Sequence, residues 1–297
     1  MTDRRSRSPG STVALQRTLH RKRMLTSLFR VIVTALLLLY SVTAIYPLLW
    51  MVLNSLKTQG EFILSTFTLP TGLRLEGYRG IFATSDVYRA LGNSVFASLV
   101  SVVFILLLAF PVSYLLARFT FRGKGALRLY FMAGILVPTY GLLVPVFVLF
   151  KNIGMLDNRA TILFPMIAFN LPVAIFLFES YIQTIPVEIE ESVFMDGALL
   201  RHRLWHVVAP ISAPIMATVV IVDALSTWNE FGFPLVLLRG QQFRTVPLWL
   251  NTFVGEHTVS YPGLMGAMVV ASIPVVVTYL FLSNRIIEGM TAGALRG

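Results

Sequence analysis

The sequence predicts an all-α membrane protein with six transmembrane helices. Of its 297 residues, 56% are hydrophobic and only 13% are charged, about half the charged share of an average soluble domain. Six windows contain no Asp, Glu, Lys or Arg: 31–56, 90–117, 129–150, 160–178, 204–222 and 257–284. Each is close to or beyond the ~20 residues that a spanning helix needs, and unsatisfied backbone groups exclude irregular chain in lipid.

The distribution of Lys and Arg predicts the orientation in the bilayer. With six spans, both termini lie on one side, together with segments 118–128 and 184–206. Sixteen of the 24 Lys and Arg residues fall in these parts of the chain, so the positive-inside bias places both termini in the cytoplasm. A nucleic-acid partner is the rival explanation for the net charge of +10, but such binding needs a basic patch on a soluble fold.

The N-terminal third is expected to hold a tail and two spans. Residues 1–25 are rich in Arg and Ser without an apolar period, which predicts a disordered basic cytoplasmic tail before a six-span domain at 26–297. The first span, at 31–54, exceeds the 7–15 apolar residues of a signal peptide and is interpreted as a retained anchor. The second span is expected at 93–117, kinked at Pro111.

The remaining four spans follow from the same pattern. A basic turn around Gly123 leads to span three at 129–150, and a short outer turn leads to span four at 160–182. Span five is expected at 207–231, an outer segment at 232–262 and span six at 263–284. Proline and glycine inside these spans are compatible with helices, because neighbouring helices can satisfy the freed carbonyl groups.

A polar segment, residues 184–206, separates spans four and five. Pro186 suits the first turn of a helix, and Glu188, Glu190 and Glu191 place negative charge at the end of the helix dipole that favours it. A helix is therefore expected at about 187–195, with Gly197 in a left-handed cap, and a second short helix at about 198–206. This helix-corner-helix element is interpreted as a docking element on the cytoplasmic face; a solvated loop is the alternative.

The polar segment resembles the EAA motif of bacterial ABC importer permeases. The matching residues are Glu191-Ser192-Val193, Asp196-Gly197-Ala198, Val207 and Ala209-Pro210, preceded by Ile185-Pro186. Ser192 and Val193 replace the two alanines of the motif. Two further stretches, 228–231 and 289–297, resemble the carbohydrate subfamily of maltose-type inner-membrane permeases. The resemblance covers nearly the whole chain.

This resemblance implies a bacterial inner-membrane sugar importer that is made of several chains with different tasks. The chain would pair with a second related permease, receive two cytoplasmic ATPase subunits, and accept sugar from an extracytoplasmic binding protein. The implied ATPase-coupling residues are Glu188, Glu191, Val193, Asp196, Gly197, Ala198 and Pro210. ATP and Mg²⁺ would be bound by the partner ATPase, because this sequence has no G-x-x-x-x-G-K-[ST] phosphate loop. No catalytic site or cofactor is expected in this chain.

Polar residues in spans four and five are candidates for the lining of the sugar pathway. Asp223 would cost ~2.5–3.5 kcal/mol facing lipid at mid-bilayer, so it should face protein or a watery cavity, and Glu230 is expected on the same helix face. Asn170, Trp228 and Asn229 complete the candidate set. Structural hydrogen bonds are the alternative for Asp223, Glu230 and Asn170, and an interfacial anchor is the alternative for Trp228.

A self-contained secondary transporter or channel is the second functional class that the sequence permits. It would use Asp223 and Glu230 as an ion or proton relay, and it would transport without an ATPase. His202 and His206 are four residues apart, as in helical zinc-binding pairs, but no third ligand stands nearby, so no metal site is expected. Glu179, at the inner end of span four, has no assigned role.

Overall fold

The protein is described by a computed structural model that covers residues 9–254 and 260–294. The described residues form helices joined by turns and loops, which agrees with the all-α prediction. The α-helices are α1 (Pro9–Ser55), α2 (Gln59–Leu64), α3 (Glu76–Ala83), α4 (Ser85–Arg118), α5 (Lys124–Ile135), α6 (Leu143–Asn152), α7 (Leu163–Ile182), α8 (Val187–Met195), α9 (Leu200–His202), α10 (Ala209–Ile211), α11 (Ala213–Trp228), α12 (Gly232–Leu237), α13 (Val246–Leu250) and α14 (Tyr261–Ala294).

Four of these helices are long and apolar enough to cross a membrane alone, and two bent pairs bring the number of possible spans to six. The single helices are α1 over Ser27–Ser55, α4, α7 and α14 over Tyr261–Phe281. The first bent pair, Lys124–Ile135 with Thr139–Asn152, turns by 92°, and the second, Leu200–Ile211 with Ala213–Trp228, turns by 78°. Spans three and five are therefore broken, where the sequence predicted continuous helices.

Prolines explain both breaks. Pro138 has no backbone N–H and restricts the residue before it to extended conformations, so α5 ends at Ile135 and a short 3₁₀ turn, Thr139–Leu142, leads into α6. In span five, Pro214 cannot donate to the carbonyl of Pro210, which lies four residues earlier. The helix therefore stops after Ile211 and restarts at Ala213, with Pro214 in its first turn.

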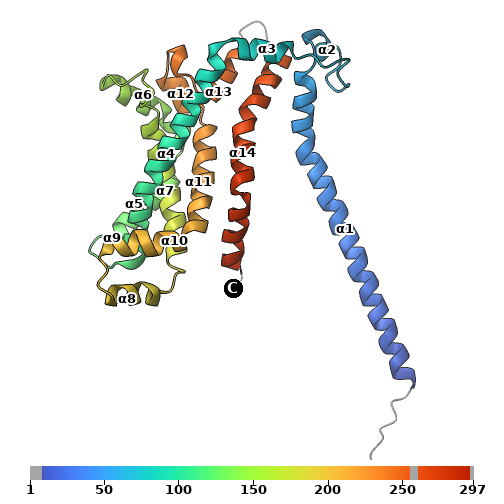
Figure 1. The fold of residues 1–297 in the computed structure, drawn as a ribbon, viewed down its shortest axis with the longest axis vertical. Helices are drawn as coiled ribbons and strands as arrows, with labels where there is room; N and C mark the ends of the chain where they lie inside the picture. The colour runs from blue at the N-terminus through green and yellow to red at the C-terminus, as the bar shows by residue number, and fades with distance from the viewer. Residues whose placement is uncertain (1–8, 255–259, 295–297) are drawn as a thin grey trace, which may run out of the picture.

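Figure 1 shows α4, α7, α11 and α14 running side by side as a bundle. Helices α2, α3, α12 and α13 gather at one end of the bundle, and α8, α9 and α10 gather at the other. We call these the α3 end and the α8 end. The N-terminus of α1 and the C-terminus of α14 both point toward the α8 end (Figure 1), so these two helix ends lie on one side, as six crossings require.

Helix α1 stands apart from the bundle for most of its length (Figure 1), and none of its apolar spanning window is buried. Its backbone is helical from Pro9, whereas the sequence predicted a disordered tail over residues 1–25. Residues 1–8 of that tail lie outside the described part of the chain. Between Ser11 and Tyr46 the sequence has no glycine or proline, so no residue with a strong tendency to end a helix interrupts α1.

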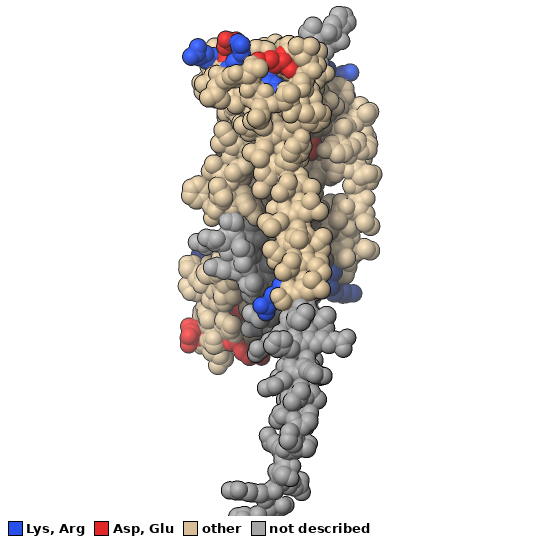
Figure 2. Space-filling view, turned by 90° about the vertical axis from the view of Figure 1, so that its right-hand side faces the viewer, with Lys and Arg blue, Asp and Glu red and all other residues tan. Residues whose placement is uncertain are grey.

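Most charged side chains on the face in Figure 2 gather at the two ends of the molecule, and the described surface between them is largely uncharged. The most extensive buried cluster lies toward the α8 end, where α4 packs on α7 around Phe110 and Phe178. Their rings meet edge to face with centroids 5.3 Å apart. Tyr114 and Val208 belong to the same cluster. The polar segment between α7 and α11 packs against this core through Ile185 and Leu204.

Candidate functional site

The predicted helix and glycine corner are present in the polar segment. Helix α8 spans Val187–Met195 with Pro186 directly before it, which confirms the predicted bounds. Gly197 has φ of +81°, the left-handed region that glycine enters without steric penalty. The N–H of Gly197 donates to the carbonyl oxygen of Phe194 at 2.9 Å, and that of Ala198 donates to Val193 at 3.3 Å. The chain therefore reverses sharply at the end of α8.

The second predicted helix, 198–206, is replaced by two shorter pieces. Helix α9 covers Leu200–His202 and continues into a π-helical segment, Arg203–Val208, so the wider turn corrects the expected α-helix. The Arg203 guanidinium lies 5.0 Å from the centre of the Phe194 ring and ties this segment to α8. The rings of His202 and His206 stack with centroids 4.3 Å apart. Among the described residues, no group of three or more His, Cys, Asp or Glu is placed to hold a metal ion.

Glu190 is the residue of α8 that sequence reasoning missed. It is only 4% exposed, while its neighbours Glu188 and Glu191 are exposed. The Tyr114 hydroxyl donates to Glu190 Oε2 and Arg118 Nε donates to Oε1, each at 2.6 Å. Arg118 Nη2 also donates to the carbonyl oxygen of Ile185 at 2.7 Å. The four-residue spacing of Tyr114 and Arg118 at the end of α4 was the available signal.

The other side of α8 and its corner is apolar and exposed. Phe194 and Met195 are the clearest examples, and Met195 is 82% exposed. The full set of exposed large apolar residues is Val187, Ile189, Phe194, Met195, Leu199 and Leu200. The carboxylates of Glu188, Glu191 and Asp196 are exposed beside them. We call these nine residues the α8 surface. Large exposed apolar residues rimmed by charge are typical of protein interaction sites.

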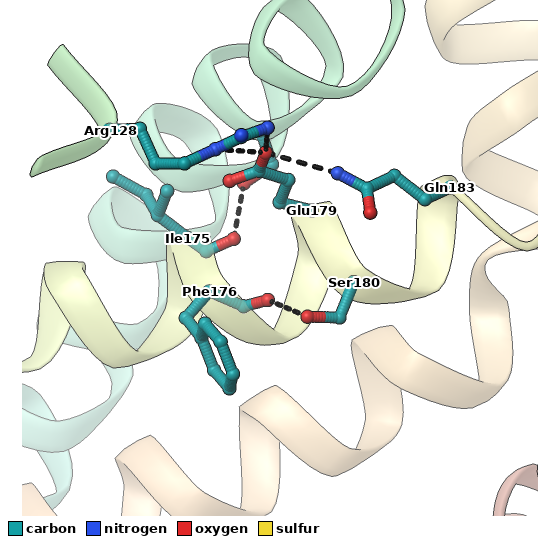
Figure 3. Close-up of polar contacts among 7 residues, drawn as sticks. Arg128, Ile175, Phe176, Glu179, Ser180 and Gln183 are labelled. Carbon is teal, nitrogen blue, oxygen red and sulfur yellow. Dashed lines mark hydrogen bonds and ion pairs between the residues drawn. The ribbon is translucent and has the colours of Figure 1, made fainter. Parts of the chain in front are cut away.

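Glu179 receives a structural explanation at the same end of the bundle. Figure 3 shows Arg128 of α5 and Gln183 at the end of α7 converging on Glu179 Oε1. Arg128 Nε donates at 2.9 Å and Gln183 Nε2 at 3.1 Å, and Arg128 Nη2 is a further donor. The Glu179 side chain is 10% exposed and that of Arg128 is 40% exposed. This ion pair holds α5 against α7 beside a cavity of about 230 Å³.

Two predicted pathway residues, Asn170 and Glu230, line one polar cavity of about 210 Å³. Thr139, Tyr140 and Ser226 contribute further polar groups to its wall. Glu230 Oε1 accepts a hydrogen bond from the N–H of Phe233 at 3.0 Å, and Asn170 Nδ2 donates to the carbonyl oxygen of Met166 at 2.7 Å. The cavity lies where α7, α11 and the bend of span three meet, so its polar groups come from three spans.

Asp223 is buried in α11 at 1% exposure. Its Oδ2 has no hydrogen-bond partner among the described residues, so the structural hydrogen bond to a neighbouring span that the sequence allowed is not formed there. The predicted shared face with Glu230 is also wrong. Helix α11 ends at Trp228, Asn229 takes the cap, and Glu230 turns to bond at the start of α12 instead.

Trp228 and Asn229 lie away from the cavity of Asn170 and Glu230. Trp228 is buried in a cluster with Val87 and Trp249, and it borders a separate apolar cavity of about 250 Å³ between α4, α11 and α14. Asn229 is exposed, and its Nδ2 donates to the carbonyl oxygen of Leu225 at 2.9 Å. The structure therefore brings together only two of the five predicted pathway residues.

Comparison with known proteins adds three findings. Residues 109–289 match the family described as "Binding-protein-dependent transport system inner membrane component". The chain is 30% identical over 270 residues to the diacetylchitobiose uptake system permease protein NgcG of Streptomyces coelicolor, covering 90% of this chain and 89% of that protein. It is also 30% identical over 259 residues to the trehalose transport system permease protein SugB of Mycobacterium tuberculosis, covering 86% and 93% of the two chains.

A solved structure gives the same picture at the level of the fold. The bacterial ABC transporter that imports the acidic polysaccharide alginate contains a chain that matches with a TM-score of 0.74 and 25% identity. The match covers 87% of this chain and 96% of that chain. The match to the family includes α8 and its corner, since residues 109–289 hold the whole of the polar segment.

Proposed function

The chain belongs to the family of binding-protein-dependent transport system inner membrane components, and from this membership we propose that it forms half of a sugar pathway across the bacterial inner membrane. It is a multi-pass permease subunit of an ABC importer and a transport component, not an enzyme. The relatives named for diacetylchitobiose and trehalose support a sugar as its substrate. A self-contained secondary carrier does not fit a family that depends on a binding protein.

The α8 surface is the proposed docking site for a cytoplasmic ATPase subunit, and it is the single observation that carries the coupling role. It lies at an end of the molecule, beyond the largely uncharged surface that lipid would cover (Figures 1 and 2). Its apolar residues are therefore exposed to water unless a protein covers them. The α8 end, and with it both termini, would face the cytoplasm, and ATP and Mg²⁺ would be bound by the ATPase.

A companion permease would complete the pathway on another side of the bundle. Helix α1 leaves its apolar window uncovered, and lipid or a neighbouring subunit can cover such a helix at little cost, because lipid tails are as apolar as its side chains. The binding protein would dock at the opposite, α3 end. Pro210 lies inside α10, two residues before the break at Ser212, so it is placed to move with the polar segment.

Cross-linking tests the proposed docking. The chain contains no cysteine, so single Val193→Cys and Met195→Cys variants each supply one thiol in α8. Treated with a thiol–amine cross-linker in the assembled complex, both are expected to give a covalent product with the ATPase subunit. Ile63→Cys is the matched control, because Ile63 is an exposed apolar residue of α2 at the α3 end. An ATPase product from Ile63→Cys, or none from the α8 positions, would contradict the orientation.

Asn170 and Glu230 are the proposed contacts to sugar hydroxyl groups in the pathway. Asn170→Ala and Glu230→Ala are each expected to lower uptake about two- to twelvefold, the effect of losing one hydrogen bond of ~0.5–1.5 kcal/mol. Uptake of labelled trehalose and diacetylchitobiose measures this effect. Asn229→Ala serves as the control, because its exposed side chain bonds only to its own helix, and a loss as large in this variant would argue against the cavity.

A further inference from the structure

We propose that Glu190, Arg118 and Tyr114 fasten α8 to the end of α4, so that a displacement of α8 is transmitted along α4 to the opposite end of the bundle. Helix α8 is joined through the chain itself only to α7 and, through its corner, to α11. The three side chains connect α8 to a third helix, α4. Arg118 and Tyr114 of α4 lie 72 and 76 residues before Glu190 in the sequence. This inference rests on the proposed function, in which an ATPase moves α8.

The geometry of the cluster favours rigid movement over sliding. Glu190 accepts from two donors on successive turns of α4, both at 2.6 Å, so the carboxylate is fixed in two directions. Arg118 also reaches the carbonyl of Ile185, which precedes α8, and thereby holds both sides of the bend into this helix. Charge-assisted hydrogen bonds of this kind are short and strong. Separating them would leave a buried charge unpaired, which is strongly unfavourable.

Helix α4 is also fastened at its other end. Near the α3 end, Asn93 Nδ2 donates to the carbonyl oxygens of Gln242 and Arg244, each at 2.9 Å. The neighbouring Ser94 Oγ accepts from the N–H of Val246 at 2.8 Å. These partners belong to the segment before and at the start of α13. Helix α4 is one continuous helix over Ser85–Arg118, with Pro111 inside it between the two clusters. One element therefore joins α8 to the surface where the binding protein is proposed to dock.

The pair Glu179–Arg128 provides an internal comparison. It is also an ion pair at the α8 end, but it joins α5 to α7, and within the described part of the chain it makes no hydrogen bond to α8. Its arginine is far more exposed than Arg118. Breaking Glu179–Arg128 should therefore leave the motion of α8 relative to α4 unchanged. Breaking the cluster of Glu190, Arg118 and Tyr114 should change that motion.

The experiment measures that motion directly. Spin labels are placed at Thr120→Cys, just after α4, and Ser192→Cys, on α8; both positions are exposed. In the assembled complex in nanodiscs, their separation is compared without nucleotide and with MgATP plus orthovanadate. With the native cluster, the distance is expected to stay constant. In Glu190→Gln it should shift with nucleotide by about 2 Å, the scale of helix shifts in switching proteins.

Three further variants decide the interpretation. Glu179→Gln should keep the constant distance, and the exchange Arg118→Glu with Glu190→Arg should restore it. Tyr114→Phe removes one donor without disturbing charge, and it replaces Glu190→Gln in the comparison if that variant does not assemble. A distance that shifts with the native cluster, stays constant when the cluster is broken, or shifts equally in Glu179→Gln would overturn the inference. If the ATPase subunits do not co-purify with the permease that carries the native cluster, this result would instead contradict the proposed function.

Discussion

Replacing Gly197 with valine is expected to abolish most of the sugar transported per ATP hydrolysed while leaving the complex assembled. The φ of Gly197 is +81°, and a Cβ built there meets nothing within 4 Å. The penalty is therefore conformational, about 1–2 kcal/mol for an L-residue in the left-handed region, and larger for a β-branched side chain. The corner would relax toward negative φ, and α8 would no longer present its surface at the same angle.

A matched glycine separates the local penalty from the effect on coupling. Gly154 has φ of +70° and equally open surroundings, but it lies in the turn after α6, far along the chain from α8. Gly154→Val should therefore lose similar stability and keep the ratio of sugar to ATP. Gly197→Asn should retain much of the coupling, because asparagine tolerates the left-handed region better than valine. Normal uptake in Gly197→Val would show that the corner does not transmit force.

Asp223→Leu is expected to stabilise the permease and to abolish transport. Burial of a carboxyl group without a hydrogen-bond partner is unfavourable by ~2 kcal/mol or more, and leucine of similar size removes that penalty. Ionisable groups inside membrane segments are energetically unfavourable and mark functional sites. We therefore expect Asp223 to lower the stability of the fold and to be needed for transport. Thermal unfolding of the complex in nanodiscs measures stability, and uptake of labelled sugar measures transport.

Thr227 supplies the control for this prediction. It is buried one turn along the same helix, and its hydroxyl donates to the backbone carbonyl of Asp223 at 2.7 Å. Thr227→Val removes a local hydrogen bond, so it should destabilise slightly and leave transport intact. Full transport by Asp223→Leu would assign Asp223 to the fold alone. A lower unfolding temperature in that variant would contradict the predicted stabilisation.

The features that the sequence predicted correctly depend on residues that are close to one another in the chain. The bounds of α8 and the left-handed conformation of Gly197 followed from the positions of Pro186, the glutamates and the glycine, all within twelve residues of one another. The four single spans and the two bent pairs lie where the sequence has windows without charge. These features depend mainly on the chain near each residue.

What the sequence could not predict depends on contacts between distant segments. Glu190 resembles its exposed neighbours in the sequence, and only the approach of α4 distinguishes it as buried. Glu179 had no role until α5 brought Arg128 beside it (Figure 3). Pro138 and Pro214 were visible, but a proline in a membrane helix is compatible with a slight kink or a full break. Packing of the surrounding helices selects between these outcomes.

Helix α1 has a consequence for the biogenesis of the protein. Because its long apolar surface makes no buried contact with the rest of the chain over the spanning window, it can insert into the bilayer as an independent helix before the later spans are synthesised. Its attachment to the other helices is made near the α3 end (Figure 1). In the newly made subunit, α1 is therefore inserted early, and its apolar surface remains free to contact other membrane proteins during assembly.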